Sequence, residues 1–541
     1  MDGKTGFYSA FDDYLAWFMQ ESPTTATVLG VHDHDDRLSD LSISSLDDQY
    51  RKNQQYLTQF EPFQLADDKD VAVDAALAVS MVRDSIREYE KLKFKLRMPD
   101  VYLEESIFGS YSLLLKEFAP LSERLKNLTG RLSDVPRVLE QGKANLTNPP
   151  KIWTEIAITH AKGGITFFED TIPIIASQCP DLAGKVIESS EKAAAAMKDF
   201  LRFLQTDLKE RSDGEFAIGE ELLNEIVREQ HMLDADADRI ERTGHSLIAS
   251  TREAMSEVAR EIAPGRDRME VLDELREQHP QPDELLNAYR DAMDRSRRFI
   301  IEHDLVTLPE GEWLEIHETP VFERATLPFA AYLMPGPFEK QQQGVFWVTP
   351  ADQSLSDDEL ETRLRGQPYG KIPVTAVHEG YPGHHLQLVR GNQAATMPRK
   401  VGASTLFVEG WAFYCEEMME QQGFLTDQAC RMLRLADQLW RACRIVIDVG
   451  LHVRGMSIDD AVRMLVDVAG LERPDAVAEV HRYTQSPTQP MCYLIGKLEI
   501  MKIADEFRAK NGSEFNLKSF HDKLLSFGSL TPKLIRTMLF D

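Results

Sequence analysis

Apolar residues recur at helical spacing along most of this chain. The clearest stripe lies within residues 193–208, where apolar side chains follow the i, i+4, i+7, i+8 order of one helix face. Its members are Ala193, Met197, Phe200, Leu201, Leu204 and Leu208. Clusters of Pro, Gly and polar residues interrupt such stripes at 147–151, 213–215, 264–267 and 278–283. The pattern predicts a mainly α protein whose helices end at these clusters.

One region has a β pattern instead. Two apolar runs, Phe329–Leu333 and Gly344–Val348, flank the sequence MPGPFEKQQQ. Short runs rich in aromatic and β-branched residues on either side of such a loop are typical of a β-hairpin. We therefore expect a small hairpin or sheet within a helical protein.

The length of the chain limits its domain organisation, and its net charge limits the partners that it can bind. The chain has 541 residues and a formal net charge of −28 at pH 7. A protein this acidic repels nucleic acid and anionic membrane surfaces, so we expect neither as a partner. Long helical enzymes can form one body with lobes, and we expect approximate lobes at 1–265, which is helical, and 266–541, which carries the site. The oligomeric state is not determined by the sequence.

The expected location is the cytoplasm. The N-terminal segment has neither a basic region nor an uninterrupted apolar run of the signal-peptide type. No segment approaches the roughly 18 charge-free apolar residues of a membrane span. The five cysteines are scattered and form no C-x-x-C pair, which is typical of reduced thiols: Cys179, Cys415, Cys430, Cys443 and Cys492.

The strongest chemical signal is the segment VTAVHEGYPGHHLQL at 374–388. It places His378, Glu379, His384 and His385 within eight residues. Neutral imidazoles hold zinc, and an adjacent carboxylate takes a proton from the metal-bound water, so this combination is typical of zinc hydrolases. The segment therefore predicts a zinc site with Glu379 as the general base.

The spacing of these histidines departs from the usual H-E-x-x-H, because Pro382 occupies the i+4 position. Proline cannot continue a regular helix, so a kink or bulge is required. If two residues loop out, His384 takes the place of the i+4 histidine. In the alternative the helix stays nearly straight and uses His385, which is about two turns or roughly 10 Å away. We favour His384 and keep His385 as the alternative ligand.

A third protein ligand is predicted in the helical segment LFVEGWAFYCEE at 406–417. Glu409 lies between apolar neighbours, unlike the other carboxylates of this segment. Glu409 and Glu416 are seven residues apart and therefore share a helix face. One of them can bind the metal while the other accepts a hydrogen bond from a ligand imidazole. We expect Glu409 to be the ligand.

These motifs resemble known families. VEGWAFYCE is similar to the N-E-G-F-A segment of gluzincin aminopeptidases, whose Glu is the third zinc ligand. HEGYPGHHLQ, EGWAFYCE and YTQSPTQPMCYLIGK together resemble the DUF885 family, as do blocks along nearly the whole chain, residues 1–541. The resemblance implies a zincin-like helical metallopeptidase fold with a small sheet beside the metal helix. In that family the pattern reads H-E-x-x-P-G-H, which favours His384, and an edge strand of such a sheet can pair with an extended substrate.

A hydrolase of this class also needs a donor for the oxyanion besides the metal, typically Tyr, His or Arg. The segment HRYTQSPTQPMCYLIGK at 481–497 supplies His481, Arg482, Tyr483 and Tyr493. Tyr493 is the preferred donor, because a phenol between buried positions must find a hydrogen-bond partner. Arg482 is the expected binder of a substrate carboxylate.

The predicted function is zinc-dependent hydrolysis of amide bonds in short peptides. A zinc amidase that acts on a small metabolite uses the same ligands and remains an alternative. A redox or non-catalytic helical metal-binding protein is the alternative of another class. Di-iron bundles normally carry two E-x-x-H pairs, and this sequence has none.

Overall fold

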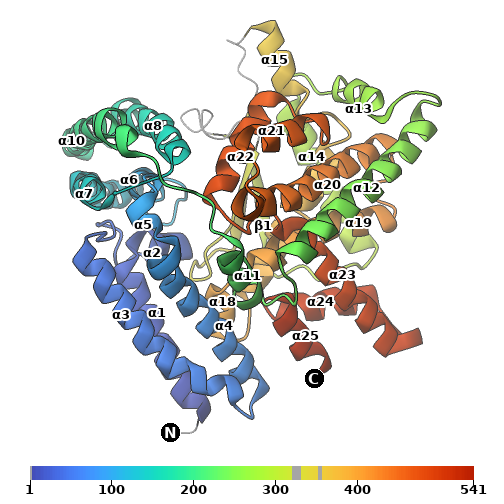
Figure 1. Ribbon diagram of the computed structural model, residues 1–541, viewed down its shortest axis with the longest axis horizontal. Coiled ribbons are helices and arrows are strands. Elements are labelled where there is room, and N and C mark those ends of the chain that lie inside the picture. Colours follow the sequence, from blue (N-terminus) through green and yellow to red (C-terminus); the bar gives the residue numbers. More distant parts are fainter. Residues whose placement is uncertain (1–2, 320–329, 351–355) are drawn as a thin grey trace. The chain divides into compact units, whose positions relative to one another are not determined.

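The chain folds into two compact units, Met1–Ile218 and Gly219–Asp541. The computed structural model describes residues 3–319, 330–350 and 356–541. The division lies upstream of the expected lobe boundary at 265–266, because α12 (Ala237–Ile262) packs along α20 (Gln428–Val449) in the second unit. Figure 1 shows these two helices side by side.

The described part of the first unit is helical, as the apolar stripes predict. Long helices pack side by side within it: α7 runs parallel to α10, and α3 runs antiparallel to α4. Of the stripe at 193–208, every member except the half-exposed Leu201 is buried. The α-helices are α1 (Gly3–Glu21), α2 (Pro23–Leu29), α3 (Ile43–Phe60), α4 (Lys69–Arg87), α5 (Phe94–Arg97), α6 (Asp100–Tyr111), α7 (Leu121–Asn145), α8 (Lys151–Thr166), α9 (Ile172–Ala176) and α10 (Pro180–Phe203).

The second unit combines helices with one small sheet. Besides α12 and α20, its helices are α11 (Glu220–Glu229), α13 (Arg268–Arg276), α14 (Leu285–Glu302), α15 (Asp357–Leu364), α16 (Ile372–Glu379), α17 (His384–Asn392), α18 (Met397–Val401), α19 (Thr405–Gln421), α21 (Ile458–Asp467), α22 (Arg473–Gln485), α23 (Cys492–Asn511), α24 (Leu517–Ser526) and α25 (Pro532–Phe540). The four predicted interruptions fall between helices, except that Lys151 is the first residue of α8, so the mainly α prediction and these helix ends are confirmed.

The sheet has three strands in the order β1-β3-β2. β2 (Ala330–Leu333) and β3 (Gln343–Val348) pair antiparallel, which confirms the predicted hairpin, although Phe329 lies outside the described residues. β1 (Trp313–Glu318) adds a parallel strand on the other side of β3. The hairpin pattern did not predict this strand. The central β3 is therefore paired on both sides, and β2 is the hairpin strand at the edge.

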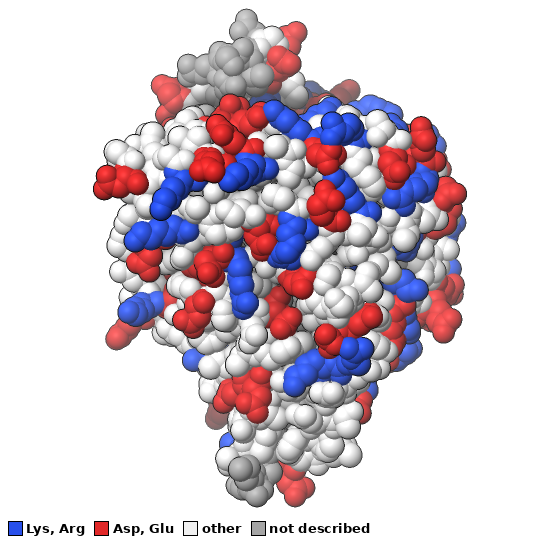
Figure 2. Space-filling view, turned by 90° about the vertical axis from the view of Figure 1, so that its left-hand side faces the viewer, with Lys and Arg blue, Asp and Glu red and all other residues white. Residues whose placement is uncertain are grey.

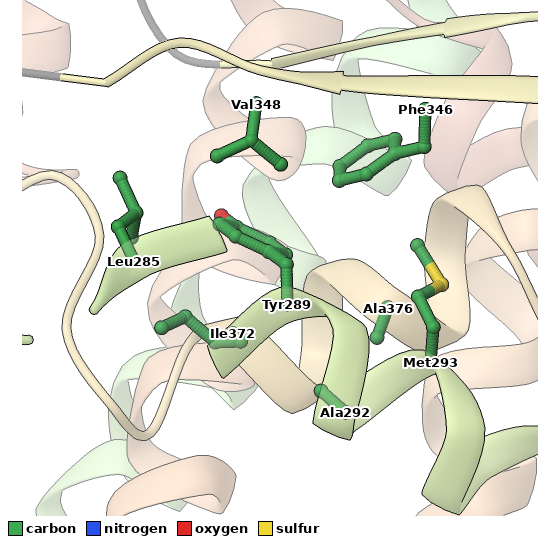
Figure 3. Close-up of a cluster of buried hydrophobic side chains, with 8 residues drawn as sticks. All are labelled: Leu285, Tyr289, Ala292, Met293, Phe346, Val348, Ile372 and Ala376. Carbon is green, nitrogen blue, oxygen red and sulfur yellow. The ribbon is translucent and has the colours of Figure 1, made fainter. Parts of the chain in front are cut away.

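An apolar core joins the sheet to the helix that carries His378. Figure 3 shows Phe346 and Val348 of β3 above Tyr289 and Met293 of α14. Ala376 of α16 lies beside these two residues of α14. All five side chains are buried. This packing fixes the position of α16 against the sheet, because a close-packed core has little free volume for a helix to shift.

The structure also shows how charged side chains are distributed on the surface and whether the cysteines form disulfides. Figure 2 shows acidic and basic side chains interspersed on the face that it draws. All five cysteines are unpaired, and four of them are buried. Among the described helices, none combines the length and the apolar character that crossing a bilayer requires.

Candidate metal centre

The metal-binding segment is two helices separated by a short break. α16 ends at Glu379 and α17 begins at His384. The Gly383 N–H donates to the Val377 carbonyl at 3.0 Å, so this hydrogen bond spans six residues instead of the four of an α-helix. Two residues are therefore inserted, and His384 lies where an i+4 histidine would lie. The structure has the bulged geometry that Pro382 predicts.

Two contacts hold the break in place. A Cβ atom on Gly383 would lie 1.9 Å from the His378 carbonyl oxygen, so only glycine fits there. The indole Nε1 of Trp411 donates to the Pro382 carbonyl at 2.8 Å, which ties the break to α19. The same helix carries Glu409. The loop, the two histidines and the carboxylate are thus positioned as one assembly.

His378, His384 and Glu409 converge on one point. One ligand atom from each of the three residues lies within 4.8 Å of the others. His384 Nε2 lies 3.5 Å from Glu409 Oε2. Two atoms bound to one tetrahedral zinc ion at ordinary bond lengths lie about 3.4 Å apart. The donor set and the separation of His384 Nε2 from Glu409 Oε2 therefore fit a zinc ion.

Glu416 supports His378 from outside this group. His378 Nδ1 donates to Glu416 Oε1 at 2.7 Å, which leaves Nε2 of the imidazole as the nitrogen for a metal. A carboxylate in this position fixes the tautomer and the ring orientation of a ligand histidine. Glu416 therefore has the hydrogen-bonding role that the seven-residue spacing predicts for one of the two carboxylates.

The centre is largely buried, and His384 and Glu409 shift the pKa of each other. Burial would raise the pKa of Glu409, but the hydrogen bond and the charge of His384 lower that pKa to about 2. Burial would lower the pKa of His384, but its contact with Glu409 raises it. His384 Nδ1 and Glu416 Oε2 are buried and make no hydrogen bond in the described part of the chain. Glu409 is therefore ionised at neutral pH, as a metal ligand must be.

His385 belongs to a different network. Its ring is fully buried, and its Nε2 donates to Glu312 Oε2 at 2.9 Å. The Tyr332 hydroxyl lies 3.0 Å from His385 Nδ1, and the Tyr381 hydroxyl donates to Glu312 at 2.7 Å. Arg297 completes the network with an ion pair to Glu312 at 3.0 Å. Both nitrogens of His385 therefore have protein partners, and the residue links β2 to the break instead of joining the three-ligand group.

A cavity of about 410 Å³ opens beside the centre. His378, Glu379 and Glu416 line it together with residues of α20 and α22. Ala330 of β2 also lines it, so the edge strand borders the same space as Glu379. A water or an amide held in this cavity is within reach of the predicted general base.

The other predicted donors lie in separate contacts. Tyr483 is fully buried, and its hydroxyl accepts from Arg444 Nε at 2.7 Å and from Trp440 Nε1 at 3.2 Å. Arg482 donates to Glu479 at 3.0 Å and to Gln489 at 2.9 Å. These partners occupy both side chains, and neither residue lines the cavity described above.

Tyr493 interacts with the centre through Glu409, although it does not line the cavity described above. Burial and then the charge of Glu409 raise the pKa of Tyr493, so its phenol is protonated at neutral pH. Its hydroxyl accepts a hydrogen bond from Gln489 at 3.3 Å. The backbones of α19 and α23 approach closely here, because a Cβ on Gly496 would lie 1.9 Å from the Leu406 carbonyl oxygen. His481 lies on the half-buried part of α22 and does not line the cavity.

Sequence reasoning missed the charged residues of the cavity wall. Lys371, Asp437 and Arg441 line the cavity, and Asp437 pairs with both cations. The available signal was Arg441 and Arg444 within the otherwise apolar run LWRACRIVI of α20. Arginines inside an apolar helix face are unusual unless they have a partner or a ligand.

The support that Glu416 gives to His378 can be measured. Glu416→Ala is expected to weaken zinc binding by about 10- to 100-fold, because His378 loses the acceptor that orients it. Competition with a chelator of known affinity measures the change. Glu420→Ala is the matched control, since Glu420 lies on the same helix but pairs with Arg434. Unchanged zinc affinity in Glu416→Ala would contradict this role.

Comparison with known proteins gives a family and a fold. The sequence profile of the family described as "Bacterial protein of unknown function (DUF885)" matches residues 23–539. No curated protein matches the chain. A "putative lipoprotein of unknown function" from Shewanella oneidensis has a similar structure, with 24% identity, 99% of each chain covered and a TM-score of 0.81. A "putative lipoprotein" from Colwellia psychrerythraea has 18% identity, the same coverage of 99% for each chain and a TM-score of 0.85. At these identities the two structures show a shared fold alone.

Proposed function

The chain belongs to the DUF885 family, whose description assigns no function, and we propose from the site itself that it is a zinc-dependent hydrolase of zincin type that cleaves amide bonds in short peptides. The observation that carries this proposal is the convergence of His378, His384 and Glu409 within 4.8 Å beside a cavity that Glu379 lines. The Glu379 carboxylate beside the three ligands favours hydrolysis over a purely metal-binding role.

Each residue has a defined task in this proposal. His378, His384 and Glu409 hold the ion, and Glu416 keeps the His378 tautomer that leaves Nε2 for it. A bound zinc ion would supply a Lewis acid and lower the pKa of a water to about 7. Glu379 takes the proton of the attacking water on its carboxylate and delivers it to the leaving nitrogen. Tyr493, protonated at neutral pH, is the phenol proposed to donate to the oxyanion.

Short peptides are the proposed substrates because of the dimensions and walls of the cavity. A volume of about 410 Å³ accommodates a few residues and excludes a folded protein. β2 lies at the edge of its sheet, and its residue Ala330 borders the cavity. A strand in this position can pair with an extended peptide backbone.

The test is cleavage of a panel of short peptides by the zinc-loaded protein, with products identified by mass spectrometry. We expect cleavage that disappears when a chelator removes zinc and returns when zinc is restored. Cleavage that is insensitive to the chelator would contradict the proposed metal dependence. Hydrolysis of small amides without cleavage of any peptide would favour the amidase alternative.

A further inference from the structure

Arg441 on α20 is held in the cavity wall by aromatic rings. Its guanidinium carbon lies 4.1 Å from the ring centroid of Trp440, 5.3 Å from that of Phe413 and 5.7 Å from that of Tyr493. The side chain is 14% exposed and lines the cavity that contains Glu379. Stacking on aromatic faces orients a planar guanidinium without using its hydrogen-bond donors.

Those donors have little use within the protein. Arg441 makes no hydrogen bond with any described residue, and its Nε and Nη1 are buried without a hydrogen-bond acceptor. Its one ion pair is a 3.4 Å contact between Nη1 and Asp437 Oδ1. Asp437 also accepts a hydrogen bond from Lys371 at 3.3 Å. With Nε and Nη1 covered by protein, Nη2 is the nitrogen that the cavity can reach.

Other arginines around the site make hydrogen bonds within the protein, although Arg444 Nη1 is also buried without one. Arg444, one turn further along α20, donates to Glu479 at 2.8 Å and to Tyr483 at 2.7 Å. Arg482, the carboxylate binder expected from the sequence, is occupied by Glu479 and Gln489. Arg441 differs from these two arginines because it makes no hydrogen bond with a described residue, so its Nη2 remains available to a ligand in the cavity.

The position of Arg441 limits how far that ligand lies from the metal centre. The Phe413 ring lies between His378 and Arg441. Its centroid is 5.9 Å from that of the His378 ring and 5.3 Å from the Arg441 guanidinium carbon. The guanidinium is therefore within about 11 Å of the His378 imidazole. An extended peptide advances about 3.3–3.6 Å per residue, so one or two residues span the distance from a scissile carbonyl to this cation.

We propose that Arg441 binds the C-terminal carboxylate of a peptide substrate, so that the enzyme removes one or two residues from the C-terminus. This inference rests on the proposed hydrolase function and names its substrate class. Carboxylate is the ligand that matches a pre-oriented guanidinium with free N–H groups. Lys371 is the other cation paired with Asp437, but Glu472 and Asp475 line the cavity near it. Their negative charges disfavour a substrate carboxylate at Lys371.

The experiment compares acetylated peptides that have a free or an amidated C-terminus. The zinc-loaded wild-type protein should cleave the free acids preferentially and release one or two residues. In Arg441→Met the KM for the acids should rise by about 10- to 100-fold, and the preference over amides should collapse. Arg441→Lys keeps the charge but loses the planar donors, and it should recover only part of the preference. Arg482→Met should retain the preference. Zinc content and the unfolding temperature verify that each variant is folded.

A binding measurement separates the two proposals. Calorimetry with an acetylated dipeptide acid and its amide, using the zinc-loaded Glu379→Gln variant with and without Arg441→Met, detects carboxylate recognition without turnover. The inference is supported if the acid binds more tightly than the amide and Arg441→Met abolishes this difference. This outcome stands even if the wild-type protein cleaves no peptide and the proposed hydrolase function fails. The inference is overturned if the protein with Arg441 binds or cleaves acids and amides equally. It is also overturned if Arg482→Met loses the preference for acids while Arg441→Met retains it.

Discussion

Glu379→Gln is expected to lower kcat by at least about 10²- to 10⁴-fold while the protein keeps its zinc and its fold. The amide has nearly the shape of the carboxylate but cannot accept the proton of the attacking water. Glu379 is not one of the three converging ligands, and its side chain faces the cavity, so its replacement leaves the metal ligands in place. Peptide hydrolysis and zinc content, measured on the same preparation, check this prediction.

Glu302→Gln is the matched control, because it makes the same chemical change at an exposed position at the end of α14. It should hydrolyse peptides at the wild-type rate. Full activity in Glu379→Gln would remove the general-base assignment. Loss of zinc in Glu379→Gln would instead place this carboxylate among the ligands.

The second large effect concerns the metal itself. The purified protein is expected to hold about one zinc ion per chain, and His378→Ala, His384→Ala or Glu409→Ala should each lose most of it. A tetrahedral site with three protein ligands retains only two after such a change. Elemental analysis after dialysis measures zinc per chain.

His385→Gln separates the two geometries of the histidine segment. Both nitrogens of His385 are occupied, by Glu312 and Tyr332, so this variant should retain zinc although its stability falls. Glutamine keeps a donor and an acceptor for these partners. Zinc that survives His384→Ala but not His385→Gln would reverse the assignment of the second histidine ligand.

The helical part of the fold was predictable because it depends on local spacing. The stripe at 193–208 and the four Pro- and Gly-containing interruptions describe real helices and their ends. The β2–β3 hairpin was also visible, since its two strands are close in sequence. β1 was not, because Trp313–Glu318 is half-exposed and mixed in polarity, and its parallel pairing with β3 is a long-range contact.

Much of the candidate centre was predictable for the same reason. His378 and His384 are near neighbours in sequence, and the position of Pro382 requires the insertion that brings them together. Glu409 and Glu416 share one helix face by their spacing. The donor residues at 481–493 were inferred mainly from their types, and the structure gives Tyr483 and Arg482 protein partners while neither residue lines the cavity.

The sequence by itself determined the helical class, the hairpin, the broken helix at Pro382 and the two faces that carry the proposed ligands, because each follows from periodicity or from the backbone chemistry of single residues. Only the tertiary structure decided which side chains share a partner. It placed His385 against Glu312, which is 73 positions away, and left Arg441 without a hydrogen bond in the described part of the chain. Hydrogen bonds and ion pairs between distant segments depend on packing geometry, and the spacing of residues within one segment carries no information about it.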